Sequence, residues 1–255
     1  MTKQIPNLFT LLNLVFGCLA IVVTLQNGID IQYDPDGMQL INIPEKIWMA
    51  SLFIGLAALV DFLDGFVARL FKASSEMGKQ LDSLADVVSF GAAPSMILYQ
   101  FLRMSMAQEE DGLNASMIWL VPAFVLACAG AWRLARFNID DSQSYGFKGV
   151  PIPAIGIVVA SLPLIYWNNH SQMIVDLLIN KWFLYGTILL LSWLMVSKLP
   201  MMALKFKDYQ LKNNIPKIIL LAVAIIAGFI FHWLAVPIVF IVYIILSLLF
   251  KQTSS

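Results

Sequence analysis

The chain has little charge, and little cysteine or histidine. Lys, Arg, Asp and Glu make up 13% of its 255 residues, and there are two histidines and two cysteines. Both cysteines, Cys18 and Cys128, fall inside apolar runs, so we expect no disulfide framework. No polar stretch is long enough for a separate soluble domain, and we find no internal repeat or low-complexity tract. We expect no nucleic-acid partner.

Apolar sequence is abundant instead. Hydrophobic residues make up 60% of the chain, and the mean hydropathy of +0.80 lies well outside the range of soluble globular proteins. Runs of about 20 apolar residues predict membrane-spanning helices. Eight runs occur, at about 7–25, 47–70, 82–104, 116–138, 151–167, 173–197, 216–232 and 234–250. The sequence therefore predicts an all-α integral membrane protein, a polytopic bundle of about eight transmembrane helices that forms one membrane domain over residues 1–255.

Lysine and arginine predict the orientation of this bundle, because cytoplasmic loops are enriched in them. An even number of spans puts both termini on one side, and 13 of the 16 Lys and Arg residues then fall on that side. The exceptions are Lys46, Arg103 and Lys181. We therefore expect both termini in the cytoplasm.

The first apolar run follows a positively charged N-terminus, as the apolar run of a signal peptide does. It lacks a convincing small-residue cleavage motif. Three polar residues, Asn7, Thr10 and Asn13, also interrupt it. We therefore expect this run to be retained as the first helix.

Four aspartates stand at the inner ends of the second and third predicted spans. Asp61, Asp64, Asp82 and Asp86 lie in the arrangement D-x2-D-G-x2-A-R-x8-G-x3-D-x3-D. A charged side chain deep in a membrane helix costs about 2.5–3.5 kcal/mol, so four would cost on the order of 10 kcal/mol without compensation. Such a cluster must face water, cations or both. The pattern predicts a metal site.

Helical geometry predicts that the four carboxylates meet. Spacings of three and four residues place Asp61 beside Asp64 and Asp82 beside Asp86. The loop between the two spans is short, so the spans should be antiparallel neighbours. Carboxylates this close repel unless a cation lies between them, and an all-oxygen ligand set favours Mg²⁺ or Mn²⁺. Four aspartates suffice for two such ions, an arrangement suited to phosphoryl chemistry.

Smaller residues of the same motif leave room for a bulky ligand. Gly65 and Ala68 share the aspartate face, Gly78 lies in the loop, and Arg69 can hold a phosphate in a forked geometry. Each has an ordinary alternative when taken alone, such as membrane anchoring for Arg69 or helix packing for a glycine. For the aspartates the alternatives are ion pairing inside the bundle, which has few basic partners nearby, and a transport pathway for cations or protons.

The motif from Asp61 to Asp86 resembles, without departure, the signature of the CDP-alcohol phosphotransferases. These membrane enzymes transfer a substituted phosphoryl group from a CDP-linked donor to an alcohol and release CMP. The resemblance implies that the four aspartates bind two divalent cations, that Asp86 also acts as the general base, and that the protein is a homodimer. It implies in addition that the cytidine diphosphate portion is held by Gly65, Ala68, Arg69 and Gly78.

Further stretches resemble the bacterial and archaeal phosphatidylserine synthases of this superfamily. They are IPNLFTLLN (5–13), SFGAAP (89–94), GAWRLARFN (130–138) and FKGVPIP (147–153). The resemblance runs to about residue 160, so we expect a catalytic core over about 1–160 and additional transmembrane helices over about 170–255. Trp132 departs from the pattern, which usually has a smaller residue there.

Three polar residues at the inner end of the fourth span are candidates for the acceptor or phosphate site. Arg133 and Arg136 are three residues apart, so both can face one cavity and meet a carboxylate or a diphosphate. Asn138 can contact the acceptor or cap the helix end. For the arginines, anchoring at the cytoplasmic surface is the alternative.

The expected reaction transfers a phosphatidyl group from CDP-diacylglycerol to L-serine, for phospholipid synthesis at the cytoplasmic face of a prokaryotic inner membrane. Glycerol 3-phosphate and inositol phosphate remain alternative acceptors, because the aspartate motif reads only the CDP moiety. A transporter for metal ions or lipid is the alternative of a different class.

Overall fold

A computed structural model describes residues 5–33, 39–70, 75–109, 112–139, 147–169, 171–202 and 211–250. Most of them lie in α1 (Ile5–Gln26), α2 (Trp48–Leu70), α3 (Glu76–Asp86), α4 (Ala93–Ala107), α5 (Val125–Ile139), α6 (Ile152–Asn168), α7 (Gln172–Leu178), α8 (Lys181–Val196), α9 (Leu211–Phe231) and α10 (Ala235–Leu249). Shorter 3₁₀ turns are η2 (Glu45–Ile47), η4 (Gly112–Asn114), η5 (Met117–Trp119), η6 (Val121–Phe124) and η8 (His232–Leu234). A π-helical stretch, η3 (Val87–Ala92), joins α3 to α4.

The described residues form an all-α membrane protein, as the sequence predicts. Within these residues, five helical segments are long and apolar enough to cross a membrane, or six if the bent pair α7–α8 is one span. The five are Pro6–Gln26, Glu45–Val67, Glu76–Ala107, Met117–Ile139 and Asn214–Leu249. All eight predicted runs are helical, but α6 is short for a span and the last two runs form one apolar stretch. The count of eight therefore stays a prediction.

Local chemistry explains the two breaks in the C-terminal half. The Asn180 side chain accepts hydrogen bonds from the backbone N–H groups of Trp182 and Phe183, so it caps a new helix there. The preceding helix α7 meets α8 at 65°. Between α9 and α10, His232 takes a φ of 50°, the left-handed conformation that ends a regular helix.

Two short antiparallel ladders were not predicted from the sequence. β1 (Asp30–Tyr33) pairs with β2 (Gln39–Asn42) between α1 and α2. β3 (Phe147–Lys148) pairs with β4 (Pro200–Met201), which joins the start of α6 to the end of α8. Two-residue and four-residue strands are too short for side-chain alternation to reveal them.

Close helix approaches build the centre of the bundle. A Cβ at Gly17 of α1 would overlap with Ser89 in η3, and one at Gly156 of α6 would lie 3.0 Å from Phe90 Cβ. Both Ser89 and Phe90 are fully buried. The π-helical stretch is therefore held between α1 and α6, where only a glycine fits on the opposing helix.

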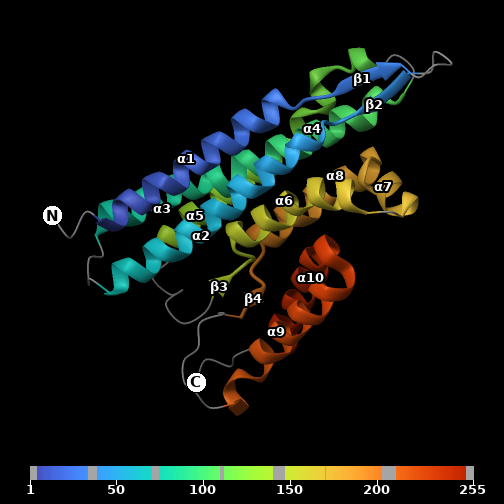
Figure 1. The fold of residues 1–255 in the computed structure, drawn as a ribbon. Coiled ribbons are helices and arrows are strands. Elements are labelled where there is room, and N and C mark those ends of the chain that lie inside the picture. Colours follow the sequence, from blue (N-terminus) through green and yellow to red (C-terminus); the bar gives the residue numbers. More distant parts are fainter. Residues whose placement is uncertain are drawn as a thin grey trace.

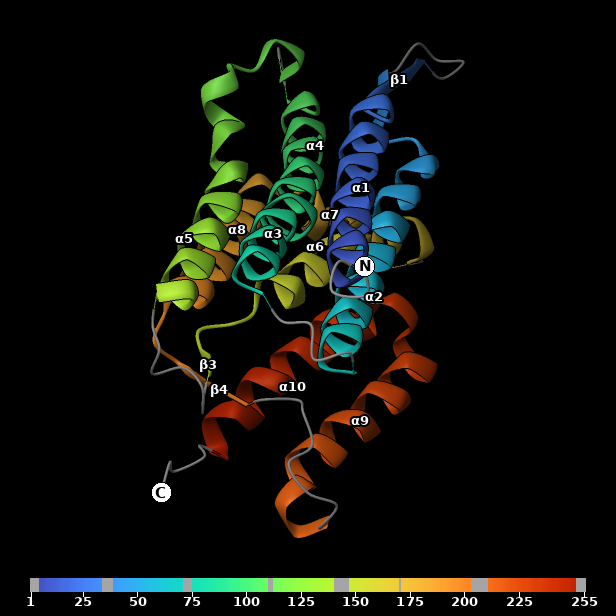
Figure 2. The same cartoon turned by 90° about the vertical axis from the view of Figure 1, so that its left-hand side faces the viewer.

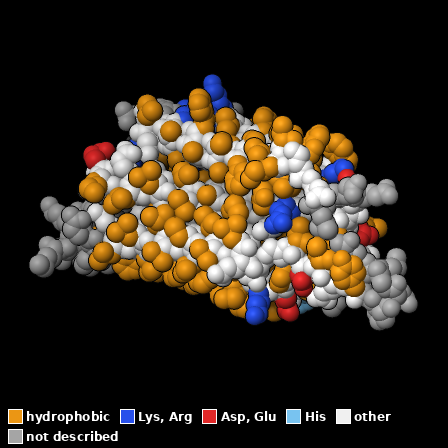
Figure 3. Space-filling view, turned by 90° about the horizontal axis from the view of Figure 1, so that it is seen from above, with side chains coloured by type: hydrophobic (Ala, Val, Ile, Leu, Met, Phe, Trp, Pro, Cys, Tyr) orange, Lys and Arg blue, Asp and Glu red, His pale blue; other side chains and the backbone are white. Residues whose placement is uncertain are grey.

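The helices lie side by side, and many apolar side chains are exposed on the outside of the bundle as well as buried inside it. Figure 1 shows the N-terminal end of α1, the end of α2 and the start of α3 at one end of the bundle, opposite the β1–β2 ladder. In Figure 2, α9 and α10 form a hairpin at the edge of the bundle, where α10 packs against α6 and β4. Exposed side chains include Leu8, Phe62 and Phe229, and the face in Figure 3 is largely hydrophobic with few charged groups. Such a surface suits contact with lipid.

Candidate metal centre

The aspartates belong to α2 and α3, and the end of α2 and the start of α3 lie at the end of the bundle that holds the start of α1 (Figure 1). Asp61 and Asp64 belong to the last turns of α2, and Asp82 and Asp86 to α3. One carboxylate oxygen from each of Asp61, Asp64 and Asp82 can be chosen so that all lie within 4.8 Å of one another. The sequence predicts that all four carboxylates meet, and three of the four lie in one cluster.

Asp86 lies outside that trio, one turn further along α3. It is buried, and its Oδ1 accepts a hydrogen bond of 3.3 Å from Asn13 Nδ2 of α1. It is the last residue of α3 before the π-helical stretch. π-helical turns inside α-helices occur frequently at functional sites.

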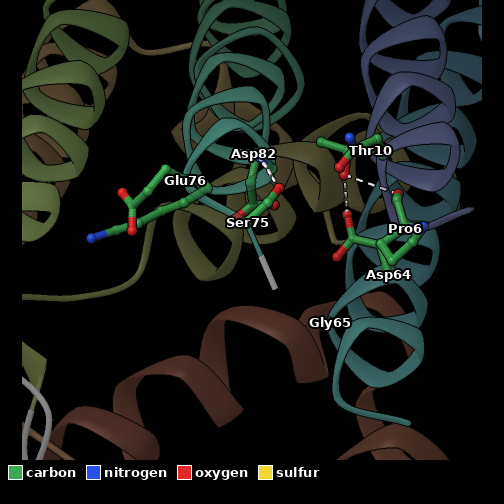
Figure 4. A pocket seen from close by; sticks show the side chains of 10 residues that line it. Pro6, Thr10, Asp64, Gly65, Ser75, Glu76 and Asp82 are labelled. Atoms are coloured by element: carbon green, nitrogen blue, oxygen red, sulfur yellow. Dashed lines mark hydrogen bonds between the residues drawn. The ribbon is translucent and has the colours of Figure 1, made fainter. Parts of the chain in front are cut away.

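Asp64 is fixed by the first helix as well. It is buried, and its Oδ2 accepts a hydrogen bond of 2.7 Å from Thr10 Oγ1. Figure 4 shows Thr10 and Asp64 on one side of a pocket, with Ser75, Glu76 and Asp82 on the other. α2 and α3 run antiparallel, as predicted, but both pack chiefly against α1. The first helix therefore links the two aspartate-bearing helices.

The pocket has a volume of about 550 Å³. It is lined by residues from the start of α1, the end of α2 and the start of α3 with its N-cap: Pro6, Asn7, Thr10, Asp64, Gly65, Ser75, Glu76, Gly78, Lys79 and Asp82. Ser75 caps α3 by accepting a hydrogen bond of 3.0 Å from the Gly78 N–H. A cavity of this size and polarity, bordered by carboxylates, suits a phosphate-bearing ligand accompanied by cations.

The residues present fit a hard divalent cation. All the clustered ligands are carboxylate oxygens, which Mg²⁺ and Mn²⁺ prefer. Asp82 Oδ1 is buried and has no hydrogen-bond partner among the described residues. A buried carboxylate oxygen without a donor is costly unless a cation approaches it. The trio of aspartates could therefore hold a metal ion.

The glycines of the motif border the pocket, and Gly78 lies in the first turn of α3 rather than in the loop that the sequence predicted for it. Gly65 and Gly78 both line the pocket. A Cβ at Gly78 would lie 3.1 Å from Asn7 Oδ1 and 3.1 Å from Ser75 Oγ, so a side chain there would narrow the pocket. The side chains of Ala68 and Arg69, at the end of α2, lie outside the described residues.

The three polar residues of α5 have different surroundings. Arg133 is only 6% exposed and interacts electrostatically with Asp86. Arg136 instead donates hydrogen bonds to the carbonyls of Val196 (2.7 Å) and Ser197 (3.1 Å), at the end of α8. Asn138 Nδ2 donates to Ser83 Oγ of α3 over 2.8 Å. Arg133 thus lies within electrostatic reach of Asp86, whereas Arg136 and Asn138 anchor α5 to neighbouring helices.

Several residues of the site were not selected from the sequence. Thr10 and Asn13 were visible only as polar interruptions of the first apolar run, and their spacing of three residues was the available signal. Tyr243 of α10 interacts electrostatically with Arg133, and its hydroxyl donates to the Met202 carbonyl over 3.0 Å. No motif marked that tyrosine, because it lies in a uniformly apolar helix.

Fold and site together define a helical membrane protein with a carboxylate cluster suited to divalent cations. Residues 3–204 match the CDP-alcohol phosphatidyltransferase family, and the chain belongs to that family. The resemblance drawn from the motif between Asp61 and Asp86 is thereby confirmed. The match continues through α8 to β4, and the α9–α10 hairpin lies beyond it.

Individual relatives carry more specific names. A CDP-diacylglycerol–serine O-phosphatidyltransferase of Helicobacter pylori (strain J99) is 36% identical over 180 residues, which cover 70% of each chain. One of Bacillus subtilis is 33% identical over 164 residues, covering 64% of this chain and 77% of the relative. An archaetidylserine synthase of Methanothermobacter thermautotrophicus is 31% identical over 162 residues, covering 63% of this chain and 58% of the relative.

Proposed function

We propose that this chain is a CDP-diacylglycerol–serine O-phosphatidyltransferase, which forms phosphatidylserine and CMP. The observation that carries the proposal is the carboxylate cluster beside a pocket of about 550 Å³, in a chain of the CDP-alcohol phosphatidyltransferase family. Relatives with this activity in their names, from Helicobacter pylori and Bacillus subtilis, support L-serine as the acceptor.

The aspartates and the pocket divide the work of binding the donor. Asp61, Asp64, Asp82 and Asp86 would hold two divalent cations, Mg²⁺ or Mn²⁺. When bound, these cations neutralise the donor diphosphate and the charge that develops on departing CMP. Gly65 and Gly78 leave space for the cytidine diphosphate portion, and Ala68 and Arg69 complete that part of the motif.

Asp86 serves as the general base in this proposal. It takes the proton of the serine hydroxyl as that oxygen attacks the lipid-side phosphorus. A new P–O bond to serine forms, the bond from this phosphorus to the oxygen that bridges to CMP breaks, and CMP leaves with that oxygen. The hydrogen bond from Asn13 aligns the Asp86 carboxylate.

Arg133 is the best-placed group for the serine carboxylate. It is a buried cation close to Asp86, and its Nε has no hydrogen-bond partner among the described residues. An intramembrane arginine is expected to be paired or functional. Arg136 and Asn138 support the same site indirectly, because they hold α5 against α8 and α3.

The reaction is placed at the cytoplasmic face of a prokaryotic inner membrane, with eight spans and both termini inside. Support comes from the 13 of 16 Lys and Arg residues that fall on that side in this topology. A membrane-bound donor and a water-soluble acceptor can meet at such a boundary, where proximity accelerates their reaction. We also propose a homodimer, which the family resemblance suggests.

The test is CMP release by purified protein supplied with CDP-diacylglycerol, Mn²⁺ or Mg²⁺, and one acceptor at a time. Serine-dependent release with phosphatidylserine as the lipid product is expected. Release with glycerol 3-phosphate or inositol phosphate instead would overturn the assignment of the acceptor. Absence of release with every acceptor, from monodisperse protein, would favour a transporter. Asp61→Asn should abolish release, and Asp176→Asn on the exposed surface of α7 is the matched control.

A further inference from the structure

The first helix presents one continuous buried seam to the rest of the bundle. Buried positions recur along it at intervals of three and four residues, and Val23 beside the last of them is buried as well: Pro6, Thr10, Asn13, Gly17, Ala20 and Thr24. This spacing defines a single face of an α-helix. The same face packs against α2, α3 and η3, so α1 contacts both helices that carry the aspartates.

Two side chains of this seam each hold one aspartate. Thr10 donates to Asp64 Oδ2 over 2.7 Å, and Asn13 donates to Asp86 Oδ1 over 3.3 Å. The backbone carbonyl of Asn13 also accepts a hydrogen bond of 3.0 Å from Ser89 Oγ. Through these three hydrogen bonds, the seam is connected to α2 at Asp64, to α3 at Asp86 and to η3 at Ser89.

The Thr10 hydroxyl lies within hydrogen-bond distance of two acceptors, so the shorter of the two distances shows which acceptor it favours. Its single proton can point to the Pro6 carbonyl at 3.2 Å, within the helix, or to Asp64 at 2.7 Å. The shorter contact is to the carboxylate. Thr24 provides a comparison, because among the described residues its hydroxyl donates only to the Ala20 carbonyl, at 2.7 Å, four residues earlier in the same helix.

A carboxylate has two oxygens, and a donor that fixes one of them fixes the direction of the other. Groups that orient metal ligands in this way typically contribute about 10–100-fold to metal affinity or activity. The orienting donor matters most where the ligands come from separate helices. Here α2 and α3 both pack chiefly against α1 rather than against each other.

We propose that Thr10 and Asn13 are positioning residues, through which α1 sets the orientation of Asp64 and Asp86 for the divalent cations and the attacking hydroxyl. The inference rests on the proposed function, in which these aspartates ligate metal. Its consequence is that metal affinity and turnover depend on two uncharged residues of the first helix.

Binding of Mn²⁺ tests the role of Thr10 without requiring turnover. Free Mn²⁺ is measured by electron paramagnetic resonance during titration of the purified full-length protein, with and without CDP-diacylglycerol. Thr10→Val, which replaces the hydroxyl with a methyl group of similar size, should weaken binding by about tenfold or more. Thr10→Ser retains the donor and should restore binding to within about twofold of the unmodified protein. Thr24→Val makes the same change on the same seam, and it should leave Mn²⁺ binding intact.

The outcomes separate positioning from packing. Unchanged Mn²⁺ affinity in Thr10→Val, or an equal loss in Thr24→Val, would overturn the role of Thr10. If Thr10→Val does not fold, Thr10→Ser and Thr10→Ala decide, since only the alanine variant should lose affinity. Absence of Mn²⁺ binding by the unmodified protein would overturn the metal site itself. The failure of the proposed function is thus distinct from the failure of this inference.

Kinetics test the role of Asn13. Asn13→Leu removes the donor to Asp86 at nearly constant volume, and it should lower kcat by about tenfold or more with little change in the KM for serine. Asn27→Leu, just beyond the far end of α1, is the control, because its side-chain amide donates only to the Val23 carbonyl in the part of the chain that the structure describes, over 2.8 Å. A rise in the serine KM with unchanged kcat would contradict positioning of Asp86. Equal losses in both variants would show a general packing effect and overturn the role.

Discussion

The side-chain amide of Asn138 on α5 donates a hydrogen bond of 2.8 Å to Ser83 Oγ on α3. One turn earlier on α3, Lys79 Nζ donates to the backbone carbonyl of Asn138 over 3.3 Å. Since α5 carries Arg133 and α3 carries Asp86, these two contacts tie the arginine-bearing helix to the aspartate-bearing helix. Asn138 can therefore support the site by holding α5 against α3, without direct contact with substrate.

Asn138→Ala should therefore weaken the reaction moderately. The variant loses the donor to Ser83 but keeps the carbonyl that Lys79 contacts. Loss of one such hydrogen bond corresponds to about 0.5–1.5 kcal/mol, or about twofold to tenfold in kcat/KM. The measurement is the CMP-release rate at low serine concentration. Asn168→Ala, whose amide donates to the Leu164 carbonyl at the end of α6 over 2.9 Å, is the control. Equal losses in the two variants would contradict a link between α5 and the site.

The sequence predicted the membrane class and the location of the aspartates because both depend on local patterns. Apolar runs revealed the helices, and spacings of three and four residues placed each aspartate pair on one face. Neither pattern contains the packing between helices. The placement of α1 beside both α2 and α3 brings Thr10 to Asp64, and that contact joins residues 54 positions apart.

Other features depend on backbone geometry, which cannot be predicted from the type of any single residue. The π-helical stretch after Asp86 and the β3–β4 pairing are of this kind. The hydrogen bond from Arg136 of α5 to the Val196 carbonyl depends on the packing of α5 against the end of α8. Helical spacing alone predicted that Arg133 and Arg136 face one cavity, and it could not predict the hydrogen bonds of Arg136 to the end of α8.

Asp86→Asn should nearly abolish turnover while the protein stays folded. The amide cannot take the proton of the serine hydroxyl, and general-base catalysis typically contributes about 10²–10⁴-fold. The readout is kcat for CMP release from protein that remains monodisperse in detergent. Asp176→Asn on α7 is the matched substitution, since that aspartate is bonded only to Gln172 among the described residues. Turnover near that of the unmodified protein would exclude Asp86 as the base.

Gly78→Ala should impair binding of the donor more than binding of the acceptor. The added methyl group would lie 3.1 Å from Asn7 Oδ1 and from Ser75 Oγ, in the wall of the pocket. We expect a higher KM for CDP-diacylglycerol and an unchanged KM for serine. Gly55→Ala in α2 controls for the higher helix propensity of alanine, because a Cβ at Gly55 meets nothing within 4 Å. An unchanged donor KM in Gly78→Ala would remove Gly78 from the cytidine diphosphate site.

Arg133→Ala should raise the KM for serine more than the KM for the donor. Arg133 is a buried cation close to Asp86, and a hydrogen bond to a charged partner is worth about 1.5–3 kcal/mol, or about 10–100-fold in affinity. Arg133→Lys keeps the charge without the forked donors, so its serine KM should lie between those of the alanine variant and the unmodified protein. Arg103→Ala, on the opposite side of the membrane in the proposed topology, is the control and should change neither KM. If the donor KM rises instead, the guanidinium binds the diphosphate, and serine must find its cationic partner elsewhere.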